Sequence, residues 1–213
     1  GARDYIAQMM FNSPPGASDA MDLAKMLAIL EMTAPLENEN FRILRQTRTG
    51  LLSYPLESNA ARAHLPASIY LQMALRPHIV HIVGHTEADH AATAADIIDA
   101  SLMARQAIAN ALKGQPDMLV DPLIQARKDH LISEARLTLA AIRSLAEPGS
   151  PDPLTDPAVL GKAVRLGILD APHLRASKIA RGEIKTRIIQ GGCEAVRPDG
   201  SPLPEAERLS TYL

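Results

Sequence analysis

The pattern that most constrains this sequence is a threefold recurrence of a short apolar run, a loop, and a helical segment. The apolar runs are DYIAQMMF (4–11), FRILRQT (41–47) and HIVHIVG (78–84), and their apolar and β-branched residues favour strands. A helix between two strands carries the chain back, so the next strand starts in the same direction. The recurrence therefore predicts an α/β fold with a parallel sheet.

The segments that follow the loops have the spacing and end signals of helices. Ser18 can cap the first helix, and Thr93 with Asp96 resembles a capping box that starts the third, which Gly114 can end. Pro66 is expected to kink or divide the second helix, within residues 59–75. The spacing of the third helix predicts a buried face made of Ile97, Ile98, Leu102, Ile108 and Leu112.

The alternation of strand and helix signals ends after residue 115. Asp121 and Pro122 signal the start of a long amphipathic helix, EPGSPDP (147–153) reads as a linker, and Asp156 with Pro157 starts a shorter helix that Gly167 can end. Two β-prone runs within residues 184–203 predict a small terminal hairpin.

Three strands do not close a barrel, which needs eight strand-helix units. The alternatives are a small open sheet or part of a barrel. We expect the C-terminal portion of a (β/α)8 TIM barrel, with about three βα units in residues 1–115. Residues 116–213 would form a helical extension and a β-hairpin packed on the same domain. The abrupt start at Gly1 fits a C-terminal fragment of a longer protein.

Composition makes several function classes improbable. Lys and Arg number 22 against 24 Asp and Glu, and aromatic residues make up 3%, so the sequence does not favour a nucleic acid partner. No uncharged apolar run is long enough to span a bilayer, and the first residues do not resemble a signal peptide. A single cysteine, Cys193, fits a reducing compartment, so we expect a cytoplasmic protein.

The loop GHTEADHAAT (84–93) concentrates ionisable groups where a parallel strand should end. Its side chains His85, Glu87, Asp89 and His90 include possible metal ligands, but their spacing matches no recognised metal motif. They could instead cap the next helix, or contact an organic ligand through Glu87 and His85. All three alternatives stay open on spacing alone.

Other candidates lie in the second loop and the third strand. Arg45 and Arg48 could hold a carboxylate or a phosphate, or could be surface ion-pair residues. His81 lies within the strand and is expected to be a core histidine. Cys193 has no evident His partner, so it is not expected to be a nucleophile.

The order of several segments resembles the later part of the large (epsilon) chain of the coenzyme B12-dependent glutamate mutase family, also called methylaspartate mutases. The segments are MDLAKMLAILE, FRILRQTRTGLLSYP, HIVHIVGHTEADHAAT and LGKAVRLGILDAPHLRASKIARGEIKTRI. The resemblance implies a TIM barrel that binds substrate inside. It also implies a separate small subunit or domain whose Asp-x-His-x-x-Gly motif holds cobalamin at the barrel mouth. Asp89-His90-Ala91-Ala92 does not match that motif.

The resemblance also suggests which residues approach the cofactor. In the family, the loop after the strand that corresponds to 78–84 carries a Lys at the strand end and a His-Glu-Ala triplet facing the cofactor, and Thr86-Glu87-Ala88 matches the Glu-Ala after a one-residue deletion. Glu87 would therefore hydrogen-bond the adenosyl ribose, while Gly84 or His85 stands in place of the lysine. No catalytic residue or metal ligand is assigned. The expected cofactor contacts are Gly84, His85, Thr86 and Glu87, with Arg48 and Thr49 from the second loop.

The activity implied is a radical carbon-skeleton rearrangement that depends on adenosylcobalamin. The expected partners are a cobalamin-binding small subunit or domain, a small amino-acid-like substrate and further copies in an oligomer, and the fragment alone is expected to be inactive. Three other functions stay open: a corrinoid-dependent methyltransferase similar to methionine synthase, a TIM-barrel metal hydrolase using His85, Asp89 and His90, and a non-catalytic scaffold.

Overall fold

The computed structural model describes residues 2–147, 149 and 152–213, so part of the predicted linker at 147–153 lies outside the described residues. The chain forms two compact units, one of residues 1–128 and 190–192 and the other of residues 129–189 and 193–213. The predicted division into 1–115 and 116–213 separates barrel units from an extension, and it stays a prediction. Within the described residues, no helix is both long and apolar enough to cross a membrane.

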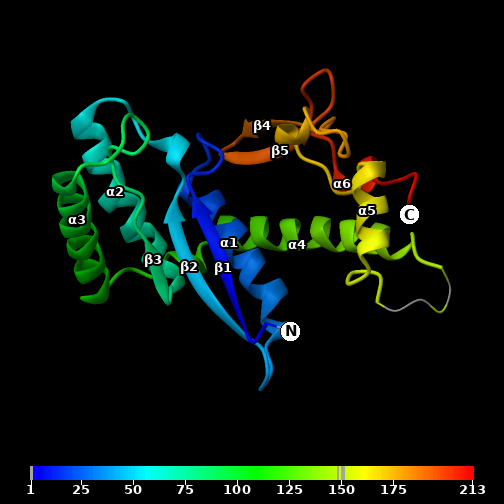
Figure 1. The fold of residues 1–213 in the computed structure, drawn as a ribbon, viewed down its shortest axis with the longest axis horizontal. Coiled ribbons are helices and arrows are strands. Elements are labelled where there is room, and N and C mark those ends of the chain that lie inside the picture. Colours follow the sequence, from blue (N-terminus) through cyan, green and yellow to red (C-terminus); the bar gives the residue numbers. More distant parts are fainter. Residues whose placement is uncertain (1, 148, 150–151) are drawn as a thin grey trace. The chain divides into compact units, whose positions relative to one another are not determined.

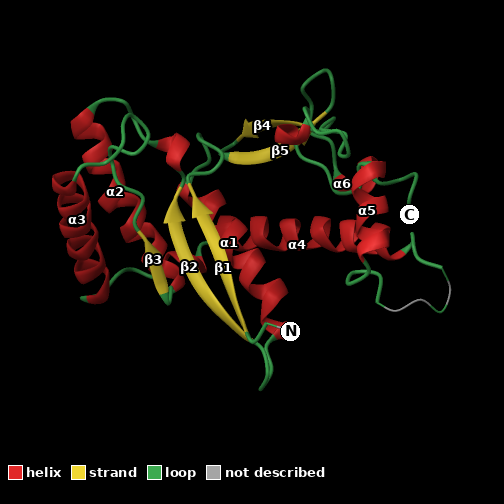
Figure 2. Ribbon diagram, in the orientation of Figure 1, coloured by secondary structure: helices red, strands yellow, loops and turns green. Residues whose placement is uncertain are grey.

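The first unit contains a parallel three-stranded sheet in the order β1-β2-β3 (Figures 1 and 2). The strands are β1 (Asp4–Phe11), β2 (Arg42–Thr49) and β3 (Ile79–His81). Both strand pairs are parallel, and the register aligns Met10 with Arg48 and Arg48 with His81. The predicted parallel α/β fold is confirmed, and the carboxyl ends of the strands meet at one edge.

Helices α1 (Asp19–Thr33) and α2 (Ser58–Gln72) pack on the same face of this sheet. Met9 and Phe11 of β1 share one buried cluster with residues of both helices, among them Leu23, Met26 and Leu71. Crossovers between parallel strands are right-handed, so strands laid down in sequential order place successive helices on one face. The sheet is therefore wound in a single direction, with both crossover helices on one face.

The opposite face of the sheet, which we call the open face, carries the alternate residues of each strand. No helix of the described part of the first unit covers it: Ile6 is 47% exposed, and Gln8 and His81 are exposed. The prediction that His81 is a core histidine is wrong for this chain, because the face to which it belongs is uncovered. The open face comprises Asp4, Ile6, Gln8 and Met10 of β1, Arg42, Leu44, Gln46 and Arg48 of β2, and Ile79 and His81 of β3.

The first two helices begin and continue for clear local reasons. Ser18 caps α1 as predicted, since its Oγ accepts the amide of Met21 at 3.3 Å. Helix α2 begins after Glu57, whose carboxylate accepts two backbone amides, and it runs unbroken through Pro66. Of the predicted kink or division at Pro66, the division is wrong, because burial of Leu65 and Ile69 stabilises the helix on both sides of the proline, and the kink stays a prediction.

Helix α3 (Ala94–Leu112) confirms its predicted capping box, with Thr93 and Asp96 bonded reciprocally. Its predicted buried face is wrong for most of its residues, and only Ile108 is partly buried. The exposed fractions of Ile98 and Leu102 are 59% and 57%, and Ile97 and Leu112 are also exposed. The buried residues of α3 are alanines instead, namely Ala100, Ala104, Ala107 and Ala111, and the first three share a cluster with residues of α2.

The second unit contains the end of α4 (Pro122–Arg143), α5 (Pro157–Leu166), α6 (Glu205–Arg208) and the two-stranded sheet of β4 (Lys185–Ile189) and β5 (Gly192–Val196). The predicted starts of α4 and α5 and the predicted terminal hairpin are confirmed. Its core is a separate cluster of Ala141, Ile142, Val159, Ala163, Ile168 and Leu209. Short 3-10 helices occur at Ala34–Leu36, Leu51–Ser53, Met73–Leu75, Met118–Val120 and Pro172–Leu174.

Candidate functional site

The carboxyl end of the open face places three side chains in one row across the strands. Met10, Arg48 and His81 are aligned by the strand register, one from each strand. The preceding residue of β2 on this face is Gln46, whose amide nitrogen lies 3.4 Å from Nδ1 of His81. Ligands of parallel α/β folds bind at this end of the strands, so this polar row is the start of the candidate site.

Arg48 has an unused donor within this row. Its Nε is buried and has no hydrogen-bond partner among the described residues. Arg45 lies three positions earlier and therefore on the other face of the strand, where its Nε donates to the carbonyl of Arg76 at 3.2 Å. The two predicted arginines do not act together, and only Arg48 belongs to the open face.

The third loop folds into a turn that fixes the carboxylate of Glu87. The Glu87 amide donates to the carbonyl of Gly84 at 3.1 Å, and a Glu87 carboxylate oxygen accepts the amide of Gly84. A Cβ at Gly84 would lie 3.0 Å from that oxygen, so a side chain there would push against the carboxylate. The turn leaves Glu87 exposed, with its second carboxylate oxygen available to a hydrogen-bond donor.

His85 and Thr86 lie inside the same turn and carry unsatisfied polar atoms. His85 is only 6% exposed, and neither its Nδ1 nor the Oγ1 of Thr86 has a hydrogen-bond partner in the described part of the chain. Buried polar atoms are nearly always satisfied by protein, water or ligand. These two atoms leave the turn with hydrogen-bonding capacity that no described residue uses.

Tyr54 joins the second loop to the third. Its hydroxyl donates to the carbonyl of Val83 at 2.7 Å, and its ring meets the imidazole of His64 edge-on at 5.1 Å between ring centres. Burial raises the pKa of the Tyr54 phenol to about 12, and the carboxylate of Glu87 adds to this effect. Tyr54 is not among the residues predicted from the sequence, although an aromatic residue directly before Pro55 in the second loop is a signal for it.

The first loop is held by a buried ion pair. Asp22 is 1% exposed, its carboxylate accepts the amide of Asn12, and it pairs with Lys25 at 2.7 Å. The ammonium of Lys25 also donates to the carbonyl of Ser13 at 2.7 Å. Burial raises the pKa of Asp22, although the neighbouring ammonium works in the opposite direction. The loop after β1 therefore has a fixed shape at the same edge of the sheet.

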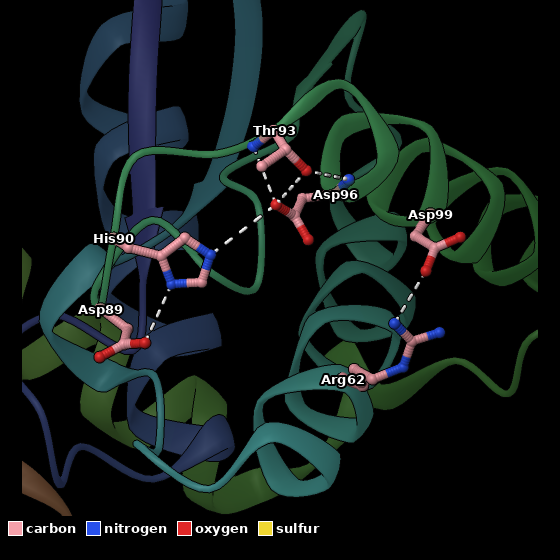
Figure 3. A network of polar contacts seen from close by, with 6 residues as sticks. All are labelled: Arg62, Asp89, His90, Thr93, Asp96 and Asp99. Atoms are coloured by element: carbon pink, nitrogen blue, oxygen red, sulfur yellow. Dashed lines mark hydrogen bonds and ion pairs between the residues drawn. The ribbon is translucent and has the colours of Figure 1, made fainter.

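His90 lies between the turn and α3: its amide donates to the carbonyl of Thr86 at 2.9 Å, while its side chain faces Asp89 and Asp96 (Figure 3). Its Nδ1 lies 2.9 Å from the carboxylate of Asp89, and its Nε2 lies 3.8 Å from that of Asp96, which also accepts the amide of Thr93. The hydrogen bond to Asp89, with the charge of both carboxylates, raises the pKa of His90. In the described residues, no group of three or more His, Cys, Asp or Glu side chains is placed to hold a metal ion.

The six predicted contact residues do not all lie together. Gly84, His85, Thr86 and Glu87 form one turn, and Arg48 lies on the open face. Thr49 is 1% exposed on the helix side, where its hydroxyl donates to Ser68 at 2.9 Å and accepts from Gln72, so it does not reach this surface.

Comparison with known proteins adds no assignment: no family model matches the chain, and no curated protein matches it significantly.

Proposed function

We propose that this chain forms part of the wall and mouth of a (β/α)8 barrel in a cobalamin-dependent carbon-skeleton mutase of the glutamate mutase type. The observation that supports this most is the open face of a sheet wound in one direction. In a barrel this face would line the interior, and its carboxyl end would form the mouth.

The polar character of the open face favours a barrel that binds a ligand inside. Gln8, Gln46 and His81 replace the bulky branched residues that fill the interior of many barrels. Gln46 and His81 are already in contact, so their orientation is partly fixed before a ligand arrives. Such groups suit a small substrate with carboxylate and amino groups, and the guanidinium of Arg48 can bind a carboxylate through paired hydrogen bonds.

The third loop has groups that fit adenosylcobalamin at the mouth. Glu87 would accept a hydrogen bond from a ribose hydroxyl, while its other oxygen stays on the Gly84 amide. The unsatisfied atoms of His85 and Thr86 would supply further hydrogen bonds to the adenosyl group. The cofactor, when bound, supplies an adenosyl radical by homolysis of its cobalt-carbon bond. The residues of this chain would bind, orient and exclude water.

The proposal is tested with the intact protein, its cobalamin-binding subunit or domain, and adenosylcobalamin. Addition of L-glutamate as the first substrate probe should give an electron paramagnetic resonance signal of coupled cobalt and organic radicals. Methyl transfer from methylcobalamin, without any radical signal, would instead identify a methyltransferase and refute the mutase.

A second measurement tests Glu87 without depending on turnover. Glu87→Ala should raise the Kd for adenosylcobalamin about tenfold, the effect of losing one hydrogen bond to a charged group. Asp89→Ala is the matched control, because this neighbouring carboxylate is exposed and contacts His90. Equal Kd values for the two variants would rule out a cofactor contact at Glu87.

A further inference from the structure

The second unit carries a concentration of positive charge that the proposed mutase function does not use. Five basic residues and a single acidic one, Glu183, lie between Pro172 and Arg187 in the sequence, although the whole chain has a net charge of −2. The basic residues are Arg175, Lys178, Arg181, Lys185 and Arg187.

Four of these five side chains line one cavity. The cavity has a volume of about 680 Å³, which lies within the range of roughly 300 to 1,000 Å³ typical of small-molecule sites. The ionisable lining residues are five cations and one anion, a net charge of +4 from this single set. They are Arg175, Arg181, Lys185, Arg187 and Arg197, with Glu183.

Most of this positive charge is uncompensated. Arg197 is neutralised by Glu207, to which its Nε donates at 3.0 Å, and Arg181 lies 3.7 Å from Glu183. In the described portion of the chain, Arg175, Lys185 and Arg187 form no ion pair. Like charges that gather without counterions repel, and a bound polyanion would relieve that repulsion.

The loop that presents these cations has a fixed shape. The carboxylate of Asp170 accepts the backbone amides of Gly182, Glu183 and Ile184, at 2.6, 2.8 and 3.3 Å. Gly182 has a φ of +60°, and a Cβ there would lie 2.2 Å from the backbone nitrogen of Arg175. This close approach holds the segments that carry Arg175 and Arg181 against each other, so the cations are positioned before any ligand arrives.

The same cavity also has apolar walls. Pro172, Ile184, Val196 and Pro198 line it together with the cations. A cavity of this size with both kinds of wall suits an anion attached to an organic body better than a bare monoanion.

We propose that the second unit binds a small molecule with two or more adjacent phosphates, of the class of pyrophosphate or a nucleoside diphosphate, through Arg175, Lys185 and Arg187. Arginine forks bind phosphate oxygens in pairs, and lysine adds a mobile point charge. Arg181, anchored by the hydrogen bond from its Nε to the carbonyl of Arg165 at 3.2 Å, would complete the site.

Isothermal titration calorimetry of the whole chain with pyrophosphate and with ADP tests this site. The double variant Arg175→Gln/Lys185→Gln should weaken binding of both probes about a hundredfold, from roughly tenfold for each lost charged contact. Lys178→Gln is the matched control, because it removes one exposed positive charge of the same segment that does not line the cavity. Its effect should stay within about twofold. The ratio of the ADP and pyrophosphate affinities identifies the source of the phosphates.

A further variant separates shape from charge. Gly182→Ala keeps every cation but disturbs the contact with Arg175, so it too should weaken binding, with circular dichroism to verify the fold. Three results would overturn the proposal: orthophosphate binding as tightly as pyrophosphate, equal losses in Lys178→Gln and the double variant, or tighter binding of a polyglutamate peptide at the same residues.

Discussion

The hydroxyl of Tyr54 allows a quantitative test of how the second and third loops are held together. Tyr54→Phe removes the donor of the 2.7 Å hydrogen bond to the carbonyl of Val83, and both residues are buried, at 6% and 2% exposure. Leaving a buried acceptor without its donor costs about 1 to 3 kcal/mol. The variant should therefore be less stable than the unchanged chain by about 1 to 2 kcal/mol at neutral pH.

The pKa of Tyr54 predicts how this difference changes in base. The phenol has a pKa of about 12 in the folded chain, against an ordinary value of 10.0. A raised pKa means that the stabilisation is complete below pH 10 and is lost as the pH rises through 12. A pKa difference of about two units corresponds to at most about 3 kcal/mol, of which about 1.4 kcal/mol is lost by roughly pH 11. The advantage of the unchanged chain over Tyr54→Phe should therefore vanish near pH 11 and then reverse.

Urea unfolding followed by far-ultraviolet circular dichroism, repeated from about pH 8 to pH 12, measures both effects. Other tyrosines and the lysines titrate in both proteins, so the difference between them isolates Tyr54. Tyr5→Phe is the control, because this ring is 48% exposed and its hydroxyl has no hydrogen bond among the described residues. A stability difference that stays constant through this pH range would refute the buried phenol, and no difference at neutral pH would refute the hydrogen bond.

Four further predictions concern other parts of the chain. The 213-residue chain should self-associate through its exposed strand edges and the exposed face of α3. The double variant Ile98→Glu/Leu102→Glu should therefore reduce the mass measured by light scattering. An unchanged chain that is monomeric and melts cooperatively would contradict this. Thr93→Ala should lower stability in urea by about 1 kcal/mol through loss of the α3 cap. The raised pKa of His90 makes its contribution complete below about pH 6.5 and lost as the pH rises through the higher folded value, so the stability difference between His90→Gln and the unchanged chain should be largest below pH 6.5 and should shrink as the pH rises. Burial opposes ionisation of Asp170, but its backbone hydrogen bonds lower its pKa overall. Its contribution to stability is therefore complete above about pH 3.8 and is lost below that pH. Asp170→Asn should speed hydrogen exchange at residues 182–184 at neutral pH.

The strands and helix starts could be predicted because their signals are local. Thr93 and Asp96 are three residues apart and complete their capping box without help from the rest of the chain. The run from Asp4 to Phe11 was predicted with its observed bounds. The third strand was predicted as seven residues, but it pairs with β2 only over Ile79–His81, because the residues after His81 leave the sheet for the third loop, where the carbonyl of Val83 accepts the Tyr54 hydroxyl instead.

The buried face of α3 could not be predicted from the size of its apolar side chains. Alanines let two helices approach closely, and Ala104 is fully buried while Leu102 points to solvent. Hydrophobic spacing identifies large residues as the core, but here the partner helix fits against the small ones.

The candidate site was predicted in part. The third loop was chosen for its ionisable residues, and Glu87 does lie in a fixed turn. The burial of the unsatisfied His85 atom and the hydrogen bond from Tyr54 to Val83 depend on contacts between distant segments, which residue spacing does not reveal. The basic cavity was not predicted, because a nearly balanced total charge conceals a local excess of Arg and Lys.

The order β1-β2-β3 has a consequence for how such a chain could grow. Each added unit would be laid beside the last one, and its helix would join the ring of helices on the same side. Added units can therefore never place a helix over the open face. This face becomes covered only when the accumulated twist bends the row of strands into an arc whose first and last strands meet. Shelter for Gln8, Gln46 and His81 would then come from strands across the circle.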